Sequence, residues 1–245
     1  MELAKEFAKH KHDLVLIARN ELKLNQLAEQ LRQQFKAEVM VIIKDLSQKG
    51  AAAFIFNQLK SADIQIDYLV NNAGFGDFEM FIDADWNKLE EMMNLNMVTL
   101  TQFCKLFLPG MKERKGGKIM NVASTAAFQP GPTMAVYYAT KAFVLHFSEA
   151  IYDELKPYNI TVTALCPGPT ESGFQEKADL HNSKLIKGKK LESSAEVAAY
   201  GYKAMMKGKA VAVHGLVNKL MVESIRFTPR NLVVKIVRNM QNETR

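Results

Sequence analysis

Short apolar runs alternate with longer stretches of helical periodicity along the chain. The apolar runs span residues 13–18, 39–43, 68–70, 118–123, 160–165 and 210–213. Helical patterns lie between them, near 20–36, 48–60, 85–114, 133–156 and 195–207. This alternation predicts an α/β fold, a doubly wound parallel sheet with helices on both faces. Because no linker, repeat or low-complexity segment interrupts it, we expect one domain over 1–245.

Composition narrows the class of protein. The chain is 48% hydrophobic, enough for a substantial core, and no run of about eighteen apolar residues predicts a transmembrane helix. The segment 2–8 has an amphipathic helix pattern, unlike the apolar block of a signal peptide. Cys104 and Cys166 form neither a disulfide framework nor a zinc spacing. We therefore expect a cytoplasmic protein without a metal site.

Tyr137 and Lys141 provide the clearest candidate chemistry. Residues four apart share one face of a helix, so the ammonium can lie near the phenol and favour its ionised form. A free phenol has a pKa of ~10, too high for efficient acid–base work near neutral pH. Ser124 stands thirteen residues before Tyr137, where a predicted strand ends. The three residues predict a proton-transfer site in which Ser124 holds a substrate oxygen.

Spacing alone is weak evidence, because a second pair shares it. Tyr152 and Lys156 are also four apart on the same predicted helix. Ala139, which has no hydroxyl, stands thirteen residues before Tyr152. The partner serine therefore favours Tyr137 over Tyr152.

Several further motifs follow in a characteristic order. These are Asn71, Asn72, Ala73 and Gly74 after one strand, Asn96 in a helix, and Pro167 and Gly168 after another strand. With Ser124, Tyr137 and Lys141, they resemble the short-chain dehydrogenase/reductase family. The resemblance implies reversible hydride transfer between nicotinamide and a carbonyl or secondary alcohol. It implies that Tyr137 is the general acid and base, that Lys141 lowers its pKa and binds the nicotinamide ribose, and that Ser124 orients the substrate oxygen.

The resemblance assigns roles to the remaining motif residues. Asn96 would hold a water through which the tyrosine exchanges protons. Asn72, Ala73 and Gly74 would lie beneath the adenosine half of the cofactor, although an ordinary strand-ending turn has the same composition. Pro167 and Gly168 would flank the nicotinamide. Ser172 stands where the family often has threonine, and it keeps the hydroxyl that can bond the nicotinamide amide.

The end of the second family strand predicts the cofactor type. Family members that prefer NAD have an acid there, whereas this chain has Ala18 followed by Arg19. A guanidinium forms charge-assisted bonds to a 2′-phosphate, so we expect NADP(H). The alternative is a solvated arginine before a helix. Asp45 matches the acid that contacts adenine in the family, or it only caps a helix.

The segment that opens the family fold has no counterpart here. An apolar strand and a glycine-rich turn usually precede the first helix, and the turn cradles the cofactor pyrophosphate. Here Met1 begins inside that helix. Because the missing strand is central, we expect the sheet to be split, and we interpret the sequence as a truncated form of a longer protein. A shortened pseudoenzyme is the alternative. Lys11 occupies a helix end where glycine is usual.

Substrate and partners are predicted only by class. Four apolar residues follow the Asn-Asn-Ala-Gly turn: Phe75, Phe78, Met80 and Phe81. The segment 174–190 resembles the family's mobile lid. We expect an apolar or amphipathic carbonyl or alcohol substrate, although these residues can equally be packing. The resemblance also implies a homo-oligomer, a dimer or tetramer.

Positive charge is concentrated at the C-terminus. Residues 203–245 form a basic helical extension with nine Lys and Arg against two Glu, a net of +7. Thr228 and Pro229 open a helix with Leu232, Val233, Ile236 and Val237 on one side. This helix could lie on an anionic membrane and reach lipid-like carbonyl substrates, or pack on its own domain or a sister subunit. We expect no nucleic-acid binding, because no recognition motif accompanies the charge.

Overall fold

The computed structural model describes residues 1–171, 173–178 and 191–241. The helices are α1 (Glu2–Lys9), α2 (Glu21–Phe35), α3 (Ala51–Ser61), α4 (Trp86–Met93), the π-helix η1 (Asn94–Thr99), α5 (Leu100–Glu113), the 3₁₀ helix η2 (Thr125–Phe128), α6 (Ala135–Leu155), the 3₁₀ helix η3 (Lys156–Tyr158), α7 (Phe174–Lys177), α8 (Ser194–Met206), α9 (Leu216–Ile225) and α10 (Arg230–Gln241). The strands are β1 (Leu14–Ala18), β2 (Val39–Ile43), β3 (Tyr68–Asn71), β4 (Gly117–Val122), β5 (Ile160–Cys166), β6 (Thr170–Glu171), β7 (Glu192–Ser193) and β8 (Val211–Val213).

All the described strands pair in parallel. Strands β3, β4, β5 and β8 form one sheet in that spatial order, and β1 and β2 form a second sheet. Each predicted apolar run overlaps one of these six strands, because buried parallel strands are apolar on both faces. The doubly wound α/β fold predicted from the sequence is therefore confirmed. The short pair β6–β7 lies apart from both sheets.

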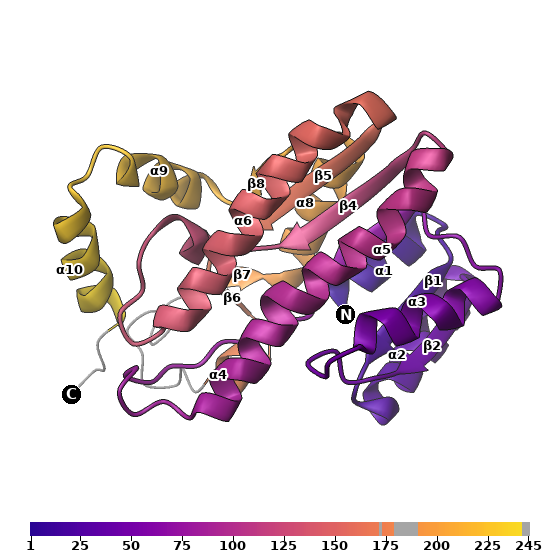
Figure 1. Ribbon diagram of the computed structural model, residues 1–245, viewed down its shortest axis with the longest axis horizontal. Helices are drawn as coiled ribbons and strands as arrows, with labels where there is room; N and C mark the ends of the chain where they lie inside the picture. The colour runs from indigo at the N-terminus through magenta and orange to yellow at the C-terminus, as the bar shows by residue number, and fades with distance from the viewer. Residues whose placement is uncertain (172, 179–190, 242–245) are drawn as a thin grey trace.

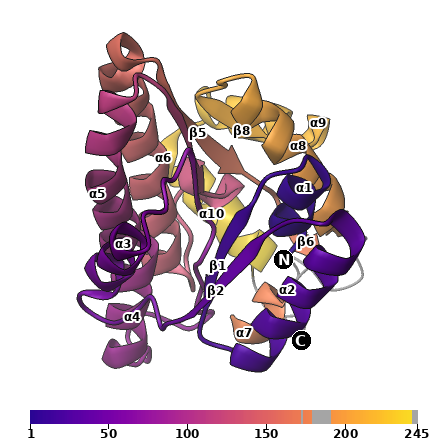
Figure 2. The same ribbon diagram turned by 90° about the vertical axis from the view of Figure 1, so that its right-hand side faces the viewer.

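Helices cover both faces of the four-stranded sheet. Helices α5 and α6 pack on one face, and α1 and α8 lie on the other (Figure 2). Helix α6 presents Val144, Leu145, Ser148 and Ile151 inward, a spacing that keeps them on one helical face. This packing fixes α6 against β4 and β5, whose carboxyl ends carry Ser124 and Pro167.

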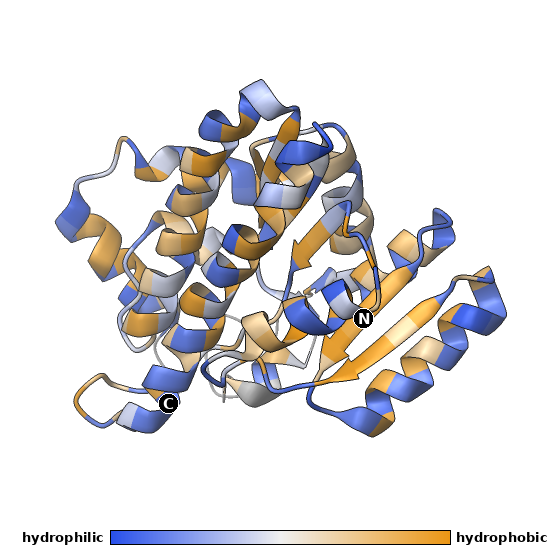
Figure 3. Cartoon of the chain, turned by 45° about the vertical axis from the view of Figure 1, so that its right-hand side comes forward, coloured by the Kyte–Doolittle hydropathy of each residue, from blue (hydrophilic) through white to orange (hydrophobic). Residues whose placement is uncertain are grey.

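A cleft separates the two sheets. In the described part of the chain, β1 pairs only with β2 and β3 pairs only with β4, so one edge of each faces the other sheet without a strand partner. The cleft has a volume of about 1110 Å³ and is lined by both edges, from Leu14 to Ala18 and from Tyr68 to Asn71. Figure 3 shows that strands β1 and β2 are strongly apolar. The expected split in the sheet is thus confirmed.

Side chains, rather than a shared strand, connect the two sheets. Phe7 of α1 packs against Tyr68 and Tyr202 on the side of the four-stranded sheet, whereas Ala8 packs with the core of β1 and α2. On the opposite face, Phe103 of α5 packs with the cluster around β2 and α3. Lys11, just after α1, has a φ of 62°, so the expected left-handed conformation is present and carries a small cost for a residue with a Cβ.

Helices α9 and α10 lie at one end of the molecule, beyond α6 (Figure 1). Val233 and Val237 of α10 are buried in a cluster that includes Tyr137, and Gln241 donates a hydrogen bond to the hydroxyl of Tyr138 at 2.6 Å. The four apolar residues predicted for one side of α10 therefore lie in two environments. Val233 and Val237 pack on the domain, whereas Leu232 and Ile236 are 48% and 46% exposed.

Candidate active site

Tyr137, Lys141 and Ser124 meet at the carboxyl ends of β4 and β5. Tyr137 and Lys141 occupy successive turns of α6, and the Lys141 ammonium nitrogen lies 5.8 Å from the centre of the Tyr137 ring. Ser124 caps the helix η2, where its Oγ accepts a hydrogen bond from the Ala126 amide at 3.1 Å. The Ser124 side chain also lies near enough to the Tyr137 phenol to favour its ionised form. The structure thus brings the three predicted catalytic residues together.

Burial sets the ionisation of this site. Desolvation raises the pKa of Tyr137, although the nearby Ser124 side chain opposes the increase. Burial also lowers the pKa of Lys141 to about 8, because its ammonium is surrounded by protein. The ammonium donates a hydrogen bond to the Val122 carbonyl at 2.8 Å. The expected lowering of the phenol pKa is therefore not found, because desolvation outweighs the opposing effect of Ser124.

Asn96 connects the turn after β3 to helix α6. It is 1% exposed and belongs to the π-helix η1, a distortion of helices often found at functional sites. Its side chain accepts from the Phe75 amide at 3.2 Å and donates to the Phe75 carbonyl and the Thr140 hydroxyl, both at 3.0 Å. Thr140 in turn donates to the Tyr137 carbonyl at 2.7 Å. Asn96 therefore holds the backbone that carries Tyr137, and its expected role toward water stays a prediction.

Two glycines let the turn after β3 approach this site closely. A Cβ on Gly74 would lie 2.9 Å from Asn96 Oδ1 and 3.5 Å from the Lys141 nitrogen. A Cβ on Gly76 would lie 2.8 Å from the Phe174 ring and 3.2 Å from the Tyr137 ring. Any larger residue would push the turn away from α6. Gly76 was not identified from the sequence, because its neighbour Phe174 is almost a hundred residues away.

Arg19 and Asp45, which end adjacent strands, lie close together. Arg19 Nη1 is 3.6 Å from Asp45 Oδ2, and the Arg19 side chain is 57% exposed. Burial tends to raise the pKa of Asp45, but hydrogen bonds from the Ser47 amide and hydroxyl and the charge of Arg19 together lower it. The Asp45 carboxylate is therefore held by a local turn contact with Ser47, beside an accessible guanidinium. It does not cap α3, whose N-cap residue is Gly50.

The turn after β5 packs against the serine. Pro167 accepts a hydrogen bond from the Thr125 amide at 2.9 Å and a longer one from Ser124 Oγ at 3.5 Å. The next residue, Gly168, accepts from Thr170 Oγ1 at 2.8 Å. The Pro167–Gly168 turn thus adjoins Ser124, and its expected place in the cofactor site stays a prediction.

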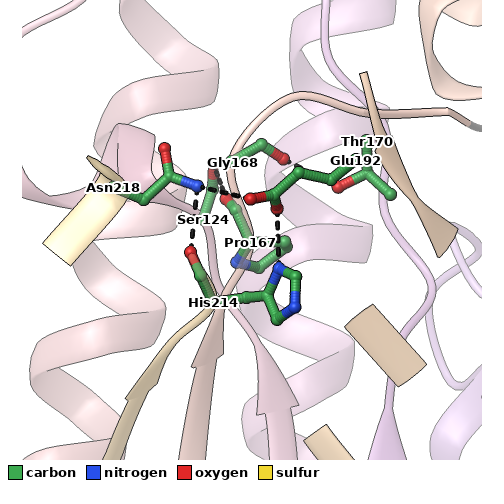
Figure 4. Close-up of polar contacts among 7 residues, drawn as sticks. All are labelled: Ser124, Pro167, Gly168, Thr170, Glu192, His214 and Asn218. Atoms are coloured by element: carbon green, nitrogen blue, oxygen red, sulfur yellow. Dashed lines mark hydrogen bonds and ion pairs between the residues drawn. The ribbon is translucent and has the colours of Figure 1, made fainter. Parts of the chain in front are cut away.

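A polar network that was not predicted from the sequence packs against the turn at Pro167 and Gly168 (Figure 4). The Glu192 carboxylate lies 2.8 Å from His214 Nδ1 and accepts from Asn218 Nδ2 at 3.2 Å. Asn218 also donates to the His214 carbonyl at 2.9 Å, and a Cβ on Gly168 would lie 2.6 Å from its amide. The only signal in the sequence was the position of His214 directly after β8, at the ligand-binding edge of a parallel sheet.

The second tyrosine–lysine pair lies in a different environment. Lys156 is 5.3 Å from the Tyr152 ring, as close as in the first pair, but it is exposed and forms an ion pair with Asp153. Helix α6 ends at Leu155, before this lysine. Distance alone therefore does not separate the pairs, whereas burial and the partner serine do.

The four apolar residues predicted to lie on the substrate side differ in burial. Phe75 is buried with Tyr137, Met134 and Phe174, and Phe78 packs beside this cluster, whereas Met80 and Phe81 are 44% and 65% exposed. Ser172 and most of the expected lid at 174–190 lie outside the described residues.

Within the described residues, no group of acids, histidines or cysteines is placed to hold a metal, and no helix is long and apolar enough to span a membrane.

Comparison with known proteins identifies the family. The family model described as short chain dehydrogenase matches residues 1–183. The chain belongs to the short-chain dehydrogenase family. It therefore belongs to a family of oxidoreductases.

Relatives and solved structures extend this assignment. The human very-long-chain 3-oxoacyl-CoA reductase is 30% identical over 99% of this chain and 76% of its own length. The reductase of the same name from Anas platyrhynchos is 36% identical over 67% of this chain and 54% of its own. A short-chain dehydrogenase from Sphingobium yanoikuyae, solved in complex with NADPH, is 27% identical with a TM-score of 0.81, covering 92% of this chain and 88% of that one. The chain thus spans about three quarters of the human relative and about half of the avian one.

Proposed function

We propose that this protein is an NADP(H)-dependent reductase of ketone carbonyls, with Tyr137 as its general acid. The observation that carries the proposal is the buried grouping of Tyr137, Lys141 and Ser124. The Tyr137 and Ser124 hydroxyls lie near each other, so a carbonyl oxygen placed between them would receive two hydrogen bonds. The raised pKa keeps the phenol protonated at neutral pH, which is the form a general acid requires.

Lys141 would stabilise the charge that develops during proton transfer. When the Tyr137 proton moves to the carbonyl oxygen, the phenol becomes a phenolate in a buried site. The ammonium on the next turn would offset that charge. Asn96 and Thr140 keep the Tyr137 backbone in place during this step.

The residues present fit part of a nicotinamide cofactor. Gly74 permits close approach beside Lys141, and the exposed Arg19 guanidinium is suited to a 2′-phosphate. We assign Arg19, Asp45, Asn72, Ala73 and Gly74 to the adenosine half, and Lys141, Pro167 and Gly168 to the nicotinamide half. When bound, NADPH would supply the hydride that reduces the carbonyl carbon. The NADPH complex of the Sphingobium relative supports this choice.

We propose 3-oxoacyl thioesters as the substrate class. The phenol side of the site is apolar, with Phe75, Met134, Tyr138 and Phe174 in one cluster with Tyr137. An acyl chain suits such a wall. The relatives that are 3-oxoacyl-CoA reductases support the same class.

The test measures the rate of NADPH oxidation with a 3-oxoacyl-CoA substrate, monitored by the absorbance of NADPH. Tyr137→Phe should lower kcat by about 10²-fold or more, because it removes the proton donor. Tyr152→Phe is the matched control and should leave kcat unchanged. Equal losses in the two variants would refute the assignment. Lys141→Met should also shift the pH profile of kcat upward for the oxidative direction, because the phenolate loses its cation.

A non-catalytic family member is the second candidate. It is favoured by the cleft beside β1, whose edge toward the larger sheet has no strand partner among the described residues. Titration of tryptophan fluorescence with NADPH distinguishes the two candidates. Micromolar affinity supports the reductase, whereas no binding supports the non-catalytic protein.

A further inference from the structure

The outer side of α9 and the loop after it expose large apolar side chains. Leu216, Val217 and Leu220 are 73%, 79% and 64% exposed, and Phe227 is 88% exposed. The first three share one side of the helix, because residues three and four apart are neighbours there. Val222 is the single buried residue of α9. We call these four exposed residues the α9 apolar patch.

Exposed cations are frequent along α9, α10 and the loop between them. The exposed basic residues of this region are Lys219, Arg226, Arg230, Lys235 and Arg238. Residues 214–241 contain one acid, Glu223, which pairs with Arg226 at 3.5 Å. Five cations against one carboxylate give this region a net charge of +4, with histidine neutral.

The inward-facing side of α10 packs in the buried apolar cluster that includes Tyr137. Val233 and Val237 of α10 are buried with Phe75 and Tyr137, and Gln241 bonds Tyr138. Figure 1 shows α9 and α10 as one continuous limb at the end of the molecule. A surface bound on the outside of this limb would therefore lie near the apolar wall of the site.

We propose that the α9 apolar patch and its cations dock onto an anionic lipid bilayer. Apolar side chains flanked by Lys and Arg are the pattern of elements that lie in a membrane interface. A second copy is a poorer partner, because a twofold contact of this face would bring five cations against five. A bilayer with acidic headgroups supplies both the apolar layer and the opposite charge. This inference concerns binding only and does not depend on the proposed reaction.

Vesicle co-sedimentation tests the proposal. The full chain should sediment with phosphatidylcholine vesicles that contain phosphatidylglycerol, and less with phosphatidylcholine alone. Added salt should weaken the binding. The combined change Leu216→Ser, Val217→Ser and Leu220→Ser should reduce affinity more than about tenfold. Arg226→Gln and Arg230→Gln should each reduce it about fivefold.

Leu22→Ser is the matched control, because Leu22 is a 69% exposed leucine on α2. It should bind vesicles like the unchanged protein. Circular dichroism checks that the variants remain folded, which the exposure of the changed residues favours. Absence of binding to acidic vesicles, or equal binding by the triple variant, would overturn the proposal. So would a dimer in solution that the triple variant converts to a monomer, because the patch would then be an interface between copies.

Discussion

At the scale of single residues, burial controls the candidate site more than charge does. Lys141 is 6% exposed and Tyr137 9% exposed, so both keep their neutral forms more readily than they would in water. The sequence predicted which residues meet, because helical spacing and strand ends fix their positions. It did not predict the direction of the Tyr137 pKa shift, because desolvation depends on side chains from distant segments such as Phe174.

A buried lysine should make stability depend on pH. The folded pKa of Lys141, about 8, lies below its ordinary value of 10.5, so the unfolded chain binds more protons between these values. The cost of the buried charge is therefore present below pH 8 and relieved as pH rises toward 10.5. Lys141→Met should raise the free energy of unfolding at pH 7 by roughly 2 kcal/mol, and the gain should shrink by pH 10. Urea unfolding at both pH values measures it, and a gain independent of pH would contradict it.

Cofactor preference should depend on Arg19. Because Ala18 rather than an acid ends β1, discrimination between NADPH and NADH should come from the contact of Arg19 with the 2′-phosphate. This charge-assisted contact contributes ~1.5–3 kcal/mol, which is about tenfold to a hundredfold in affinity. Arg19→Ala should weaken NADPH and leave NADH nearly unchanged, and Ala18→Asp should shift preference toward NADH. The measurement is kcat/KM with each cofactor. An unchanged protein that prefers NADH would show that Arg19 only pairs with Asp45.

At the scale of elements, the apolar runs predicted the strands well. The helical periodicity did not predict where a long helix is interrupted. The predicted helix at 85–114 is divided into α4, η1 and α5. The π-helix places Asn96 against Phe75 and Thr140, and these contacts come from other elements. No local pattern reports such a distortion. The network at Glu192 was also missed, because its partners are 22 and 26 residues away.

The Glu192 network should position the Pro167–Gly168 turn. Glu192→Ala leaves His214 and Asn218 without their shared acceptor, a loss of about 1–2 kcal/mol. We expect an increase in KM for NADPH of about tenfold with a smaller change in kcat, because the turn adjoins Ser124 without holding the proton donor. Glu196→Ala, an exposed acid on α8, is the control. A change in kcat alone would contradict this positioning role.

At the scale of the whole molecule, the cleft between the sheets dominates the energetics. A strand of five or six buried aliphatic residues contributes ~10 kcal/mol, comparable to the stability of a whole domain. Fusing an apolar strand and a glycine-rich turn before Met1 should therefore raise Tm, sharpen the thermal transition and strengthen NADPH binding. A Gly/Ser extension of equal length should do neither. Calorimetry and cofactor titration measure the effects, and a fused chain that melts and binds NADPH no better than the Gly/Ser extension would contradict the expectation.

The joining of the two sheets by side chains alone also has a kinetic consequence. No inter-strand hydrogen bond connects β1 and β2 to the larger sheet within the described residues, so the β1–α2–β2–α3 unit can separate without breaking the ladder from β3 to β8. Amide hydrogens of β1 and β2 should then exchange with solvent deuterium as one group, faster than those of β4 and β5. Equal protection in both sheets would show that Phe7 and Phe103 lock them as firmly as a strand would.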